Sequence, residues 1–514
     1  MPPAPGPNSS GIIADAEPYT SDRGFFGHPR GLSTLFFTEM WERFSYYGIR
    51  PLLVLFMTAA LTSGGFGFDR QTASAIVGIY AASVYLASLP GGWIADRWLG
   101  LRRTIYYGAV LITLGHFAIA LSSIFSKPAF FAGLVFIVLG TGLLKPNISA
   151  IVGDLYPSAD ARRDAGFSIF YMGINVGALI APLITGYLGE RIGWHLGFGA
   201  AGVGMLIGLI TYRLRAADTL GPLGVLPSGT PEQQRTVKNV TMFGIGLVVL
   251  AMLLTMTGAL TIDPVVIGER MAYVMLGTAV VYFGYLFLFA GLNTDEKKRM
   301  GVILVLAIFA TIFWSAFEQA PTSLNLFAAD FTDRHLFGWE VPILWLQSVN
   351  SFFVITLAPV FAALWVTMAR RGQELSSIAK FTFALLFAGF GFWLMVAAAN
   401  MVIEGGPGTR VSMWWLTGSY LLQTIGELSL SPVGLSSMTK LSPRRFVGQM
   451  MGVWFLATAL GNLIAGLVGG HVDPNNLEQM PQLFQRTAFS LFIATAVLGL
   501  MIVPIRRMMG EAKH

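Results

Sequence analysis

The sequence predicts an all-α polytopic membrane protein with fourteen membrane-spanning helices. The chain has 514 residues, of which 54% are hydrophobic and only 12% are charged, and its mean hydropathy is +0.65. Soluble globular domains carry roughly 25% charged residues. Most of the chain also divides into apolar stretches of about 20 residues, the length that crosses a bilayer core of about 30 Å. The lipid bilayer is therefore an expected partner.

Fourteen apolar stretches can be placed along the chain. They are 31–60, 74–97, 104–123, 129–150, 165–188, 197–214, 239–262, 268–291, 300–327, 342–368, 377–400, 411–438, 446–468 and 483–505. An even number of spans places both termini on the same side of the membrane.

The charge of the loops gives the orientation. The excess of 33 Lys and Arg over 27 Asp and Glu falls mainly in alternate loops, on the side of the termini. Those loops contain Arg97, Arg102, Arg103, Arg162, Arg163, Arg213, Arg215, Arg235, Lys238, Lys297, Lys298, Arg299, Arg370, Arg371, Lys380, Lys440, Arg444 and Arg445. Because cytoplasmic loops are enriched in Lys and Arg, we expect both termini to lie in the cytoplasm. The positive charge indicates topology, and we expect no nucleic-acid partner.

The polar segments divide the chain into five parts. We predict a disordered cytoplasmic tail, a six-helix bundle, a cytoplasmic linker, an accessory hairpin and a second six-helix bundle, at residues 1–30, 31–215, 216–238, 239–292 and 299–508 respectively. The two hairpin helices lack ionisable residues in their interiors, which indicates that they face lipid. Two six-helix halves around a central site are an architecture for alternating access; a channel or a membrane enzyme is the alternative.

The first apolar stretch contains an unusual polar stripe. At 100° per residue one face of the helix collects Glu39, Glu42, Arg43, Tyr46, Tyr47 and Arg50. An ionisable side chain at membrane depth is costly unless it is paired or hydrated, so this face must line a cavity or a helix interface. A purely structural ion-pair cluster is the alternative interpretation.

Three further charges lie inside other apolar stretches. A rise of 1.5 Å per residue places Arg50 about 25 Å and Glu318 about 27 Å from the cytoplasmic side, so the two can pair. We predict that this pair is an outer gate and that protonating Glu318 opens it. Glu427 lies near the midplane. Lys145 lies closer to the cytoplasm, where it is predicted to gate with Glu42 or Glu427.

The separated charges suit a small zwitterion. Arg43 and Lys145 can hold a carboxylate and Glu427 an amine, at a separation that an extended peptide of two or three residues spans. Aromatic residues suited to line such a cavity are Tyr46, Tyr47, Tyr85, Trp314 and Trp454. The chain has no Cys, no P-loop and no metal-ligand spacing. We expect a non-enzymatic transporter without a cofactor, in which protons are the coupling ion.

Several motifs resemble one family. The segment "EMWERFSYYG" is similar to the ExxERFxYYG motif of the proton-coupled oligopeptide transporters, a branch of the major facilitator superfamily. Further similar segments are "GGWIADRWLGLRRT", "GTGLLKPNIS", "FYMGINVGAL", "FWSAFEQ" and "GELSLSPVGLSSMTKLSP". The resemblance spreads over nearly all twelve core helices, and bacterial members share the extra helix pair. It implies the major facilitator fold and symport of di- and tripeptides with protons across a bacterial inner membrane. We expect the protein to function as a monomer.

The resemblance also implies roles for single residues. Proton coupling falls on Glu39, Glu42, Arg43 and Glu318. Peptide binding falls on Arg43, Tyr46, Tyr47, Tyr85, Lys145, Asn175, Trp314, Asn350, Glu427, Trp454 and Thr458. The resemblance also implies that Arg50 and Glu318 form an outer gate, while the inner gate of Lys145 with Glu427 or Glu42 stays a prediction from depth. Mammalian members have a histidine in the second helix, where this chain has Gly78 or a neighbour, which favours proton handling by carboxylates alone.

Other functions remain as alternatives. A family member that carries nitrate or another small anion would use Arg43 and Lys145 but would have little need for Glu427. A membrane receptor would bind without flux, and a membrane enzyme would form a product.

Overall fold

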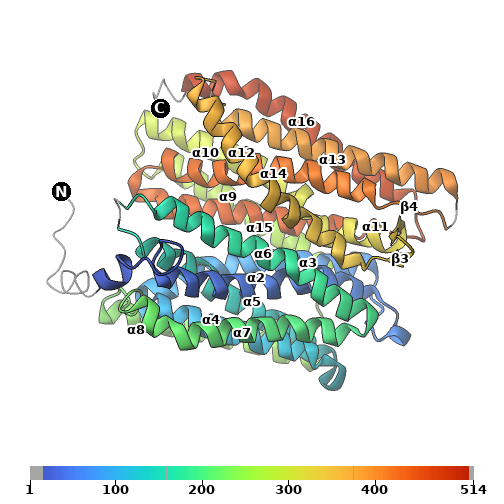
Figure 1. Cartoon of the computed structure of the whole chain (residues 1–514), viewed down its shortest axis with the longest axis horizontal. Coiled ribbons are helices and arrows are strands. Elements are labelled where there is room, and N and C mark those ends of the chain that lie inside the picture. Colours follow the sequence, from blue (N-terminus) through green and yellow to red (C-terminus); the bar gives the residue numbers. More distant parts are fainter. Residues whose placement is uncertain (1–15, 158–159, 374, 407, 509–514) are drawn as a thin grey trace. The chain divides into compact units, whose positions relative to one another are not determined.

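The computed structural model describes residues 16–157, 160–373, 375–406 and 408–508. Within these ranges fourteen helices have 20 or more residues, one for each predicted apolar stretch (Figure 1). They are α2 (Arg30–Thr58), α3 (Arg70–Ile94), α4 (Leu101–Ala120), α5 (Ser122–Asp154), α6 (Arg163–Arg191), α7 (Trp194–Leu220), α8 (Pro231–Met256), α9 (Pro264–Leu288), α10 (Thr294–Phe317), α12 (Ser348–Arg370), α13 (Ser377–Gly405), α14 (Trp414–Leu441), α15 (Val447–Gly469) and α16 (Gln479–Met508). The prediction of an all-helical chain with fourteen long helices is confirmed.

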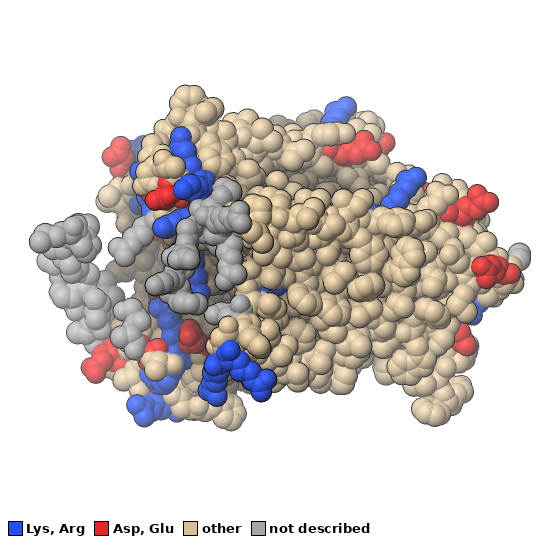
Figure 2. Space-filling model, turned by 90° about the horizontal axis from the view of Figure 1, so that it is seen from above, with Lys and Arg blue, Asp and Glu red and all other residues tan. Residues whose placement is uncertain are grey.

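The composition of these helices fits a membrane. Among the described residues, eleven helical segments are long and apolar enough to cross a bilayer. The other three long helices are α2, α4 and α14, whose charged and polar side chains lower their hydropathy. Figure 2 shows a broad surface with almost no charged side chains, while Lys, Arg, Asp and Glu gather toward its ends. The protein is therefore a multi-pass membrane protein.

The chain packs as two compact units. Unit 1 comprises residues 1–49 and 86–262, and unit 2 comprises residues 50–85 and 263–514. The boundary passes through α2 and α3, so the segment 50–85 packs with the helices that follow residue 263. We name this segment the outer hairpin after its predicted side of the membrane. The predicted division into two six-helix bundles is a different partition of the same helices and stays a prediction.

Unit 1 is held together by close helix packing. The glycines of α4 and α5 face one another: a Cβ on Gly115 would lie 2.6 Å from the Gly133 carbonyl oxygen, and one on Gly108 would lie 2.7 Å from that of Gly140. Small residues let membrane helices approach this closely. The aromatic core includes Phe130 and Phe198, whose ring centroids are 6.2 Å apart.

The connection between α7 and α8 is shorter than predicted and is fixed to its own unit. Helix α7 continues to Leu220, beyond the apolar stretch, so only residues 221–230 connect it to α8. The Arg102 guanidinium donates to the Gly221 carbonyl at 2.5 Å, and the Ser228 hydroxyl donates to the Asp96 carbonyl at 2.9 Å. Thr230 then starts α8 with a capping box. The connection therefore lies along the π-helical turn η2 (Ala95–Leu99) and the start of α4.

Residues 16–29 also pack onto unit 1. The Arg162 guanidinium donates to the carbonyls of Thr20, Asp22 and Gly27. It also pairs with Asp160 at 2.7 Å, and the hydrogen bonds from Arg162 lower the pKa of Asp160 to about 2. This part of the predicted tail is thus bound to the loop before α6, while the predicted disorder of residues 1–15 lies outside the described residues.

The α8–α9 hairpin exposes apolar surface, as expected for a lipid-facing element. In the most apolar window of α8 no residue is buried within the protein, and in that of α9 only 17% are. Asp263 begins α9 by accepting from the backbone amides of Val265 and Val266.

Unit 2 contains the remaining helices and four short strands. Here α10 is followed by the π-helical turn η3 (Ala320–Leu324) and by α11 (Asn325–Asp330). Strand β1 (Thr332–Asp333) pairs in parallel with β4 (Val411–Ser412), and β2 (His335–Leu336) pairs antiparallel with β3 (Trp339–Glu340). Three 3-10 turns are also described: η1 (Leu61–Ser63), η4 (Ile343–Gln347) and η5 (Arg444–Phe446). Phe484 packs against Phe327 and Phe392 in the core.

Candidate functional site

A buried charge cluster lies on α2 in unit 1. Arg43 Nε is 3.2 Å from Glu39 Oε1 and also pairs with Glu42. All three side chains are almost completely buried. One guanidinium therefore faces two carboxylates, an arrangement in which a proton on either acid would leave more of the cation's charge for another anion.

Of the other predicted residues of unit 1, Tyr46, Tyr47 and Lys145 lie beside this cluster. The Arg43 guanidinium lies 5.2 Å from the centre of the Tyr46 ring, and Tyr46 contacts Tyr47 edge to face. Lys145 on α5 interacts electrostatically with Glu39. Asn175 on α6 is buried and donates to the Tyr171 carbonyl of its own helix.

A second polar cluster, in unit 2, is built around a carboxylate. Asn350 Nδ2 on α12 donates to Glu427 Oε2 at 3.2 Å and to Thr424 Oγ1 at 2.9 Å, both on α14. Glu427 is half-buried. Its hydrogen-bond partner is a neutral amide, so its negative charge can attract a cation that reaches the cluster.

The ion pair expected from helix depth is present in unit 2. Arg50 Nη1 lies 2.6 Å from Glu318 Oε2, and Arg50 Nη2 donates to Asn462 Oδ1 on α15 at 2.5 Å. Next to Arg50, the carbonyl of Pro51 accepts from Asn325 at 2.8 Å. The outer hairpin is thus bonded to three segments of unit 2; the gating role of these bonds stays a prediction.

A second ion pair holds the other end of the outer hairpin. Arg70, the first residue of α3, pairs with Asp330 at 2.6 Å and donates to the Val472 carbonyl at 2.7 Å. Both side chains are partly exposed, at 19% and 25%. Exposed pairs contribute little to stability, about 0–1 kcal/mol, so the buried Arg50 pair is the stronger candidate for control.

The outer hairpin also crosses α15 at backbone distance. A Cβ on Gly78 would lie 2.8 Å from the Gly466 Cα. A histidine at Gly78, which mammalian relatives were expected to carry there or nearby, would not fit this crossing.

Gly78→Ala should therefore destabilise the protein. Forcing a methyl group against a backbone costs about 1–3 kcal/mol, and a lower melting temperature in detergent would report it. Gly301→Ala on α10 is the matched control, since a Cβ there would meet nothing within 4 Å. Equal melting temperatures for the two variants would contradict the close crossing.

The four remaining predicted residues belong to unit 2. Trp314 contacts Phe313 and Phe317 on its own helix. Trp454 lies against Gly434, and its carbonyl accepts a hydrogen bond from the Thr458 hydroxyl. Tyr85 on α3 is half-buried. Each unit thus holds part of the predicted set, with the acid–Arg43 cluster in one and Glu427 in the other; no role in peptide contact follows for Trp454 or Thr458 from these bonds.

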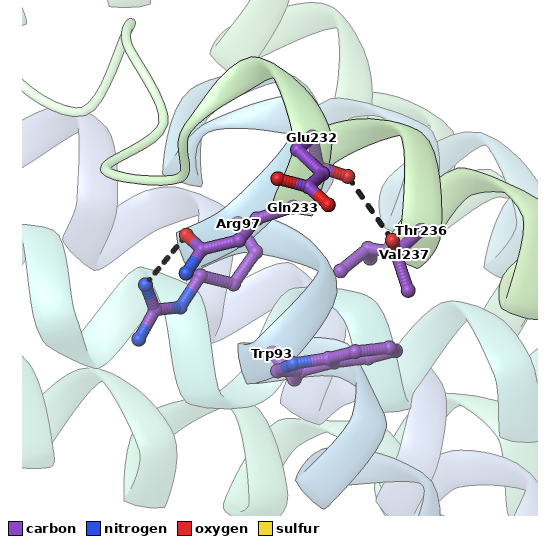
Figure 3. A pocket seen from close by; sticks show the side chains of 6 residues that line it. All are labelled: Trp93, Arg97, Glu232, Gln233, Thr236 and Val237. Atoms are coloured by element: carbon purple, nitrogen blue, oxygen red, sulfur yellow. Dashed lines mark hydrogen bonds between the residues drawn. The ribbon is translucent and has the colours of Figure 1, made fainter.

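A surface groove of about 340 Å³ lies where α3 meets α8 (Figure 3). Its lining residues are Trp93, Arg97, Glu232, Gln233, Thr236 and Val237. Arg97 donates to Gln233 at 3.0 Å, which adds to the bonds that fix the α7–α8 connection. Most side chains that line this groove are exposed, so the groove is not part of the buried charge clusters.

The predicted site residues do not include Asn462, Asn325, Arg70 or Asp330. The depth of a residue is informative only for ionisable side chains inside apolar stretches, and the family resemblance added Asn175 and Asn350 but neither Asn462 nor Asn325. Arg70 and Asp330 lie at helix ends. An amide inside the apolar run "ATALGNLIAGLVGG" was the available signal for Asn462, because an unpaired buried amide is costly.

Comparisons with known proteins give one consistent result. The family model described as the POT family matches residues 102–215 and 269–482. The peptide transporter YePEPT of Yersinia enterocolitica is 51% identical over 498 residues, covering 96% of this chain and 97% of the relative. The di-/tripeptide transporter of Lactococcus lactis is 36% identical, covering 96% and 99%.

Solved structures agree. The crystal structure of peptide transporter POT in complex with sulfate has a TM-score of 0.87 at 38% identity, covering 96% of this chain and 99% of that one. A POT family transporter in complex with 5-aminolevulinic acid has a TM-score of 0.85 at 36% identity, covering 94% and 98%. The fold class and the family resemblance are confirmed, and the relatives are named as transporters rather than enzymes. The chain belongs to the POT family of transporters, within the major facilitator superfamily.

Proposed function

We propose that this protein imports di- and tripeptides across a bacterial inner membrane by symport with protons, with both termini in the cytoplasm. The observation that carries the proposal is the division of charge between the buried clusters. Arg43 with Glu39 and Glu42 lies in one unit, and Glu427 with Asn350 lies in the other. A peptide carries both complementary charges, whereas most other small solutes carry one or none.

Coupling to protons follows from the cluster on α2. While Glu39 and Glu42 are both ionised, they compensate the charge of Arg43. When one of these acids takes a proton, the Arg43 guanidinium loses one of its two negative partners. A peptide carboxylate can then take the place of that acid, and Lys145 is the second cation that binds it. Protonation and carboxylate binding then strengthen each other by the same factor, because coupling between two binding events is reciprocal. This favours the carrier state that holds both.

The amine of the peptide is assigned to Glu427. Asn350 donates to one carboxylate oxygen, which orients the group without neutralising it. Tyr46, Tyr47, Tyr85, Asn175, Trp314, Trp454 and Thr458 are proposed to line the cavity. Aromatic walls tolerate varied side chains, since much of their contact is apolar.

Loading of a new peptide from outside requires the outer end to open. Arg50 paired with Glu318 and Asn462 is proposed to keep the outer hairpin closed, and a proton on Glu318 to remove the ion pair. The coupling ion is the proton, no cofactor is needed, and a single copy of the chain is sufficient.

Uptake into proteoliposomes tests the proposal. Labelled dialanine should accumulate when the outside is more acidic than the lumen, and a protonophore should reduce the signal to simple equilibration. Absence of gradient-stimulated uptake of every di- and tripeptide tried would contradict peptide symport.

Transport of a small anion is the competing function, because Arg43 and Lys145 could bind nitrate. A parallel assay with labelled nitrate distinguishes the two. Gradient-driven nitrate uptake that is unaffected by Glu427→Gln, together with no dipeptide uptake, would favour the anion.

A further inference from the structure

The terminal nitrogens of Arg50 bond to two chemically different acceptors. Nη1 faces the Glu318 carboxylate at 2.6 Å, and Nη2 faces the Asn462 amide oxygen at 2.5 Å. Arg50, Glu318 and Asn462 are buried, with exposed fractions of 6%, 8% and 1%. One acceptor can be neutralised by a proton and the other cannot.

The Asn462 amide is oriented by its own helix. Its Nδ2 donates to the Thr458 carbonyl at 2.9 Å, so its oxygen is the atom that points to Arg50. The neighbouring Gly461 allows α15 to approach α10 closely, because a Cβ there would lie 2.5 Å from the Trp314 Cβ and 3.0 Å from the Ser315 nitrogen. This approach brings Asn462 and Glu318 to the same guanidinium.

The charged groups around this point come from three helices. Arg50 comes from α2 and Glu318 follows α10. Glu427 on α14 interacts electrostatically with Glu318. From α15 the group that reaches Arg50 is the neutral Asn462. If Glu318 becomes neutral, the amide oxygen still accepts from Arg50.

We propose that Asn462 is a positioning residue that holds Arg50, and with it the outer hairpin, when Glu318 carries a proton. The inference rests on the proposed gating role of Arg50 and Glu318. Asn462 then keeps the guanidinium within reach, so that the ion pair forms again as soon as Glu318 loses its proton. A hydrogen bond to a charged group changes a closed–open equilibrium by about 10- to 100-fold.

The chain offers a clean reporter of opening. It contains no Cys, so a single introduced thiol has no background. Ser74 in the outer hairpin is completely buried, and a Cβ on Gly469 of α15 would lie 3.2 Å from the Ser74 Cβ. In Ser74→Cys, a maleimide can react only when this contact opens. Thr62→Cys, at an exposed position in η1, measures intrinsic reagent reactivity.

The decisive comparison uses Glu318→Gln to imitate the protonated acid. In that background, Asn462→Ala should raise the labelling rate of Ser74→Cys about tenfold or more. Asn462→Asp should lower it below that of Glu318→Gln alone, because a carboxylate again faces Arg50. Both Asn462 variants lose the bond to Thr458, so the difference between them isolates the acceptor that faces the guanidinium.

Asn325→Ala is the matched control. It removes an amide that bonds the backbone of the outer hairpin at Pro51 and not the guanidinium. Its effect on labelling should be the same with Glu318 as with Gln at that position. A labelling rate unchanged by Asn462→Ala, or one that Asn462→Asp does not lower, would overturn the inference.

The assay also separates this inference from the proposed function. Labelling needs neither peptide nor a proton gradient, and size-exclusion profiles establish that each variant is folded. If dialanine uptake fails while Asn462→Asp slows labelling, the proposed cargo is wrong and the role of Asn462 stands. If uptake succeeds and labelling is unchanged, only the role of Asn462 is wrong.

Discussion

Glu318→Gln is expected to abolish proton-driven accumulation of dialanine. The substitution keeps the size of the side chain but removes the charge that pairs with Arg50 at 2.6 Å. Removing one partner of a buried ion pair leaves the other charge uncompensated, at a cost of about 3–5 kcal/mol. The outer closure would then no longer depend on a proton, so uptake under an imposed gradient should fall to the level of equilibration.

Counterflow measures what the variant retains. Exchange of labelled dialanine against unlabelled peptide needs no gradient, and it should persist in Glu318→Gln. The matched control is Asp330→Asn, which removes the other ion pair of the outer hairpin, at side chains that are partly exposed. That variant should accumulate dialanine nearly normally. Normal accumulation by Glu318→Gln would exclude the gating role.

Glu427→Gln is expected to weaken dialanine binding at least about 30-fold. Loss of one partner of a buried, hydrogen-bonded charge pair costs about 2–5 kcal/mol, and Asn350 would lose the carboxylate to which it donates. Binding can be measured by inhibition of counterflow. N-acetyl-dialanine, which has no amine charge, is the diagnostic ligand, because its weak binding should change little between wild type and variant.

Ser429→Ala on the same helix is the control for Glu427→Gln. Ser429 is buried and donates to the Ile425 carbonyl within α14, so Ser429→Ala tests the effect of packing alone. Unchanged dialanine affinity in Glu427→Gln would place the amine elsewhere.

Arg43→Ala should abolish exchange of dialanine, because it removes the cation proposed to bind the peptide carboxylate.

The helices and the depth of the buried charges could be predicted because both follow from simple spacing. An apolar stretch of about 20 residues predicts a membrane-spanning helix. A rise of 1.5 Å per residue then places Arg50 and Glu318 at similar depth in the membrane. The ion pair at 2.6 Å satisfies that expectation. A hydropathy threshold alone leaves out α2, α4 and α14, and α2 and α14 carry charged residues of the candidate site.

The contacts that fix the outer hairpin could not be predicted from local sequence. Asn462 and Asn325 are short neutral residues. The crossing of Gly78 and Gly466 depends on which helices pack together, and the spacing of residues within one helix does not predict that. The helix break at η3 follows Glu318 within an apparently continuous apolar run. The binding of residues 16–29 by Arg162 is equally non-local, because the acceptors are backbone carbonyls that any sequence supplies.

The fixed connection between α7 and α8 determines where a second domain can be inserted into this protein. By length and composition residues 221–230 resemble a suitable place to insert a fluorescent domain. However, Gly221 is bonded to Arg102 at the start of α4 and Ser228 to Asp96 of η2, so the connection is held at both ends. The turn from Thr257 to Asp263 is exposed along most of its length. Exposed turns accept inserted domains best, so a sensor of transport should be assembled there, between the two helices that face lipid.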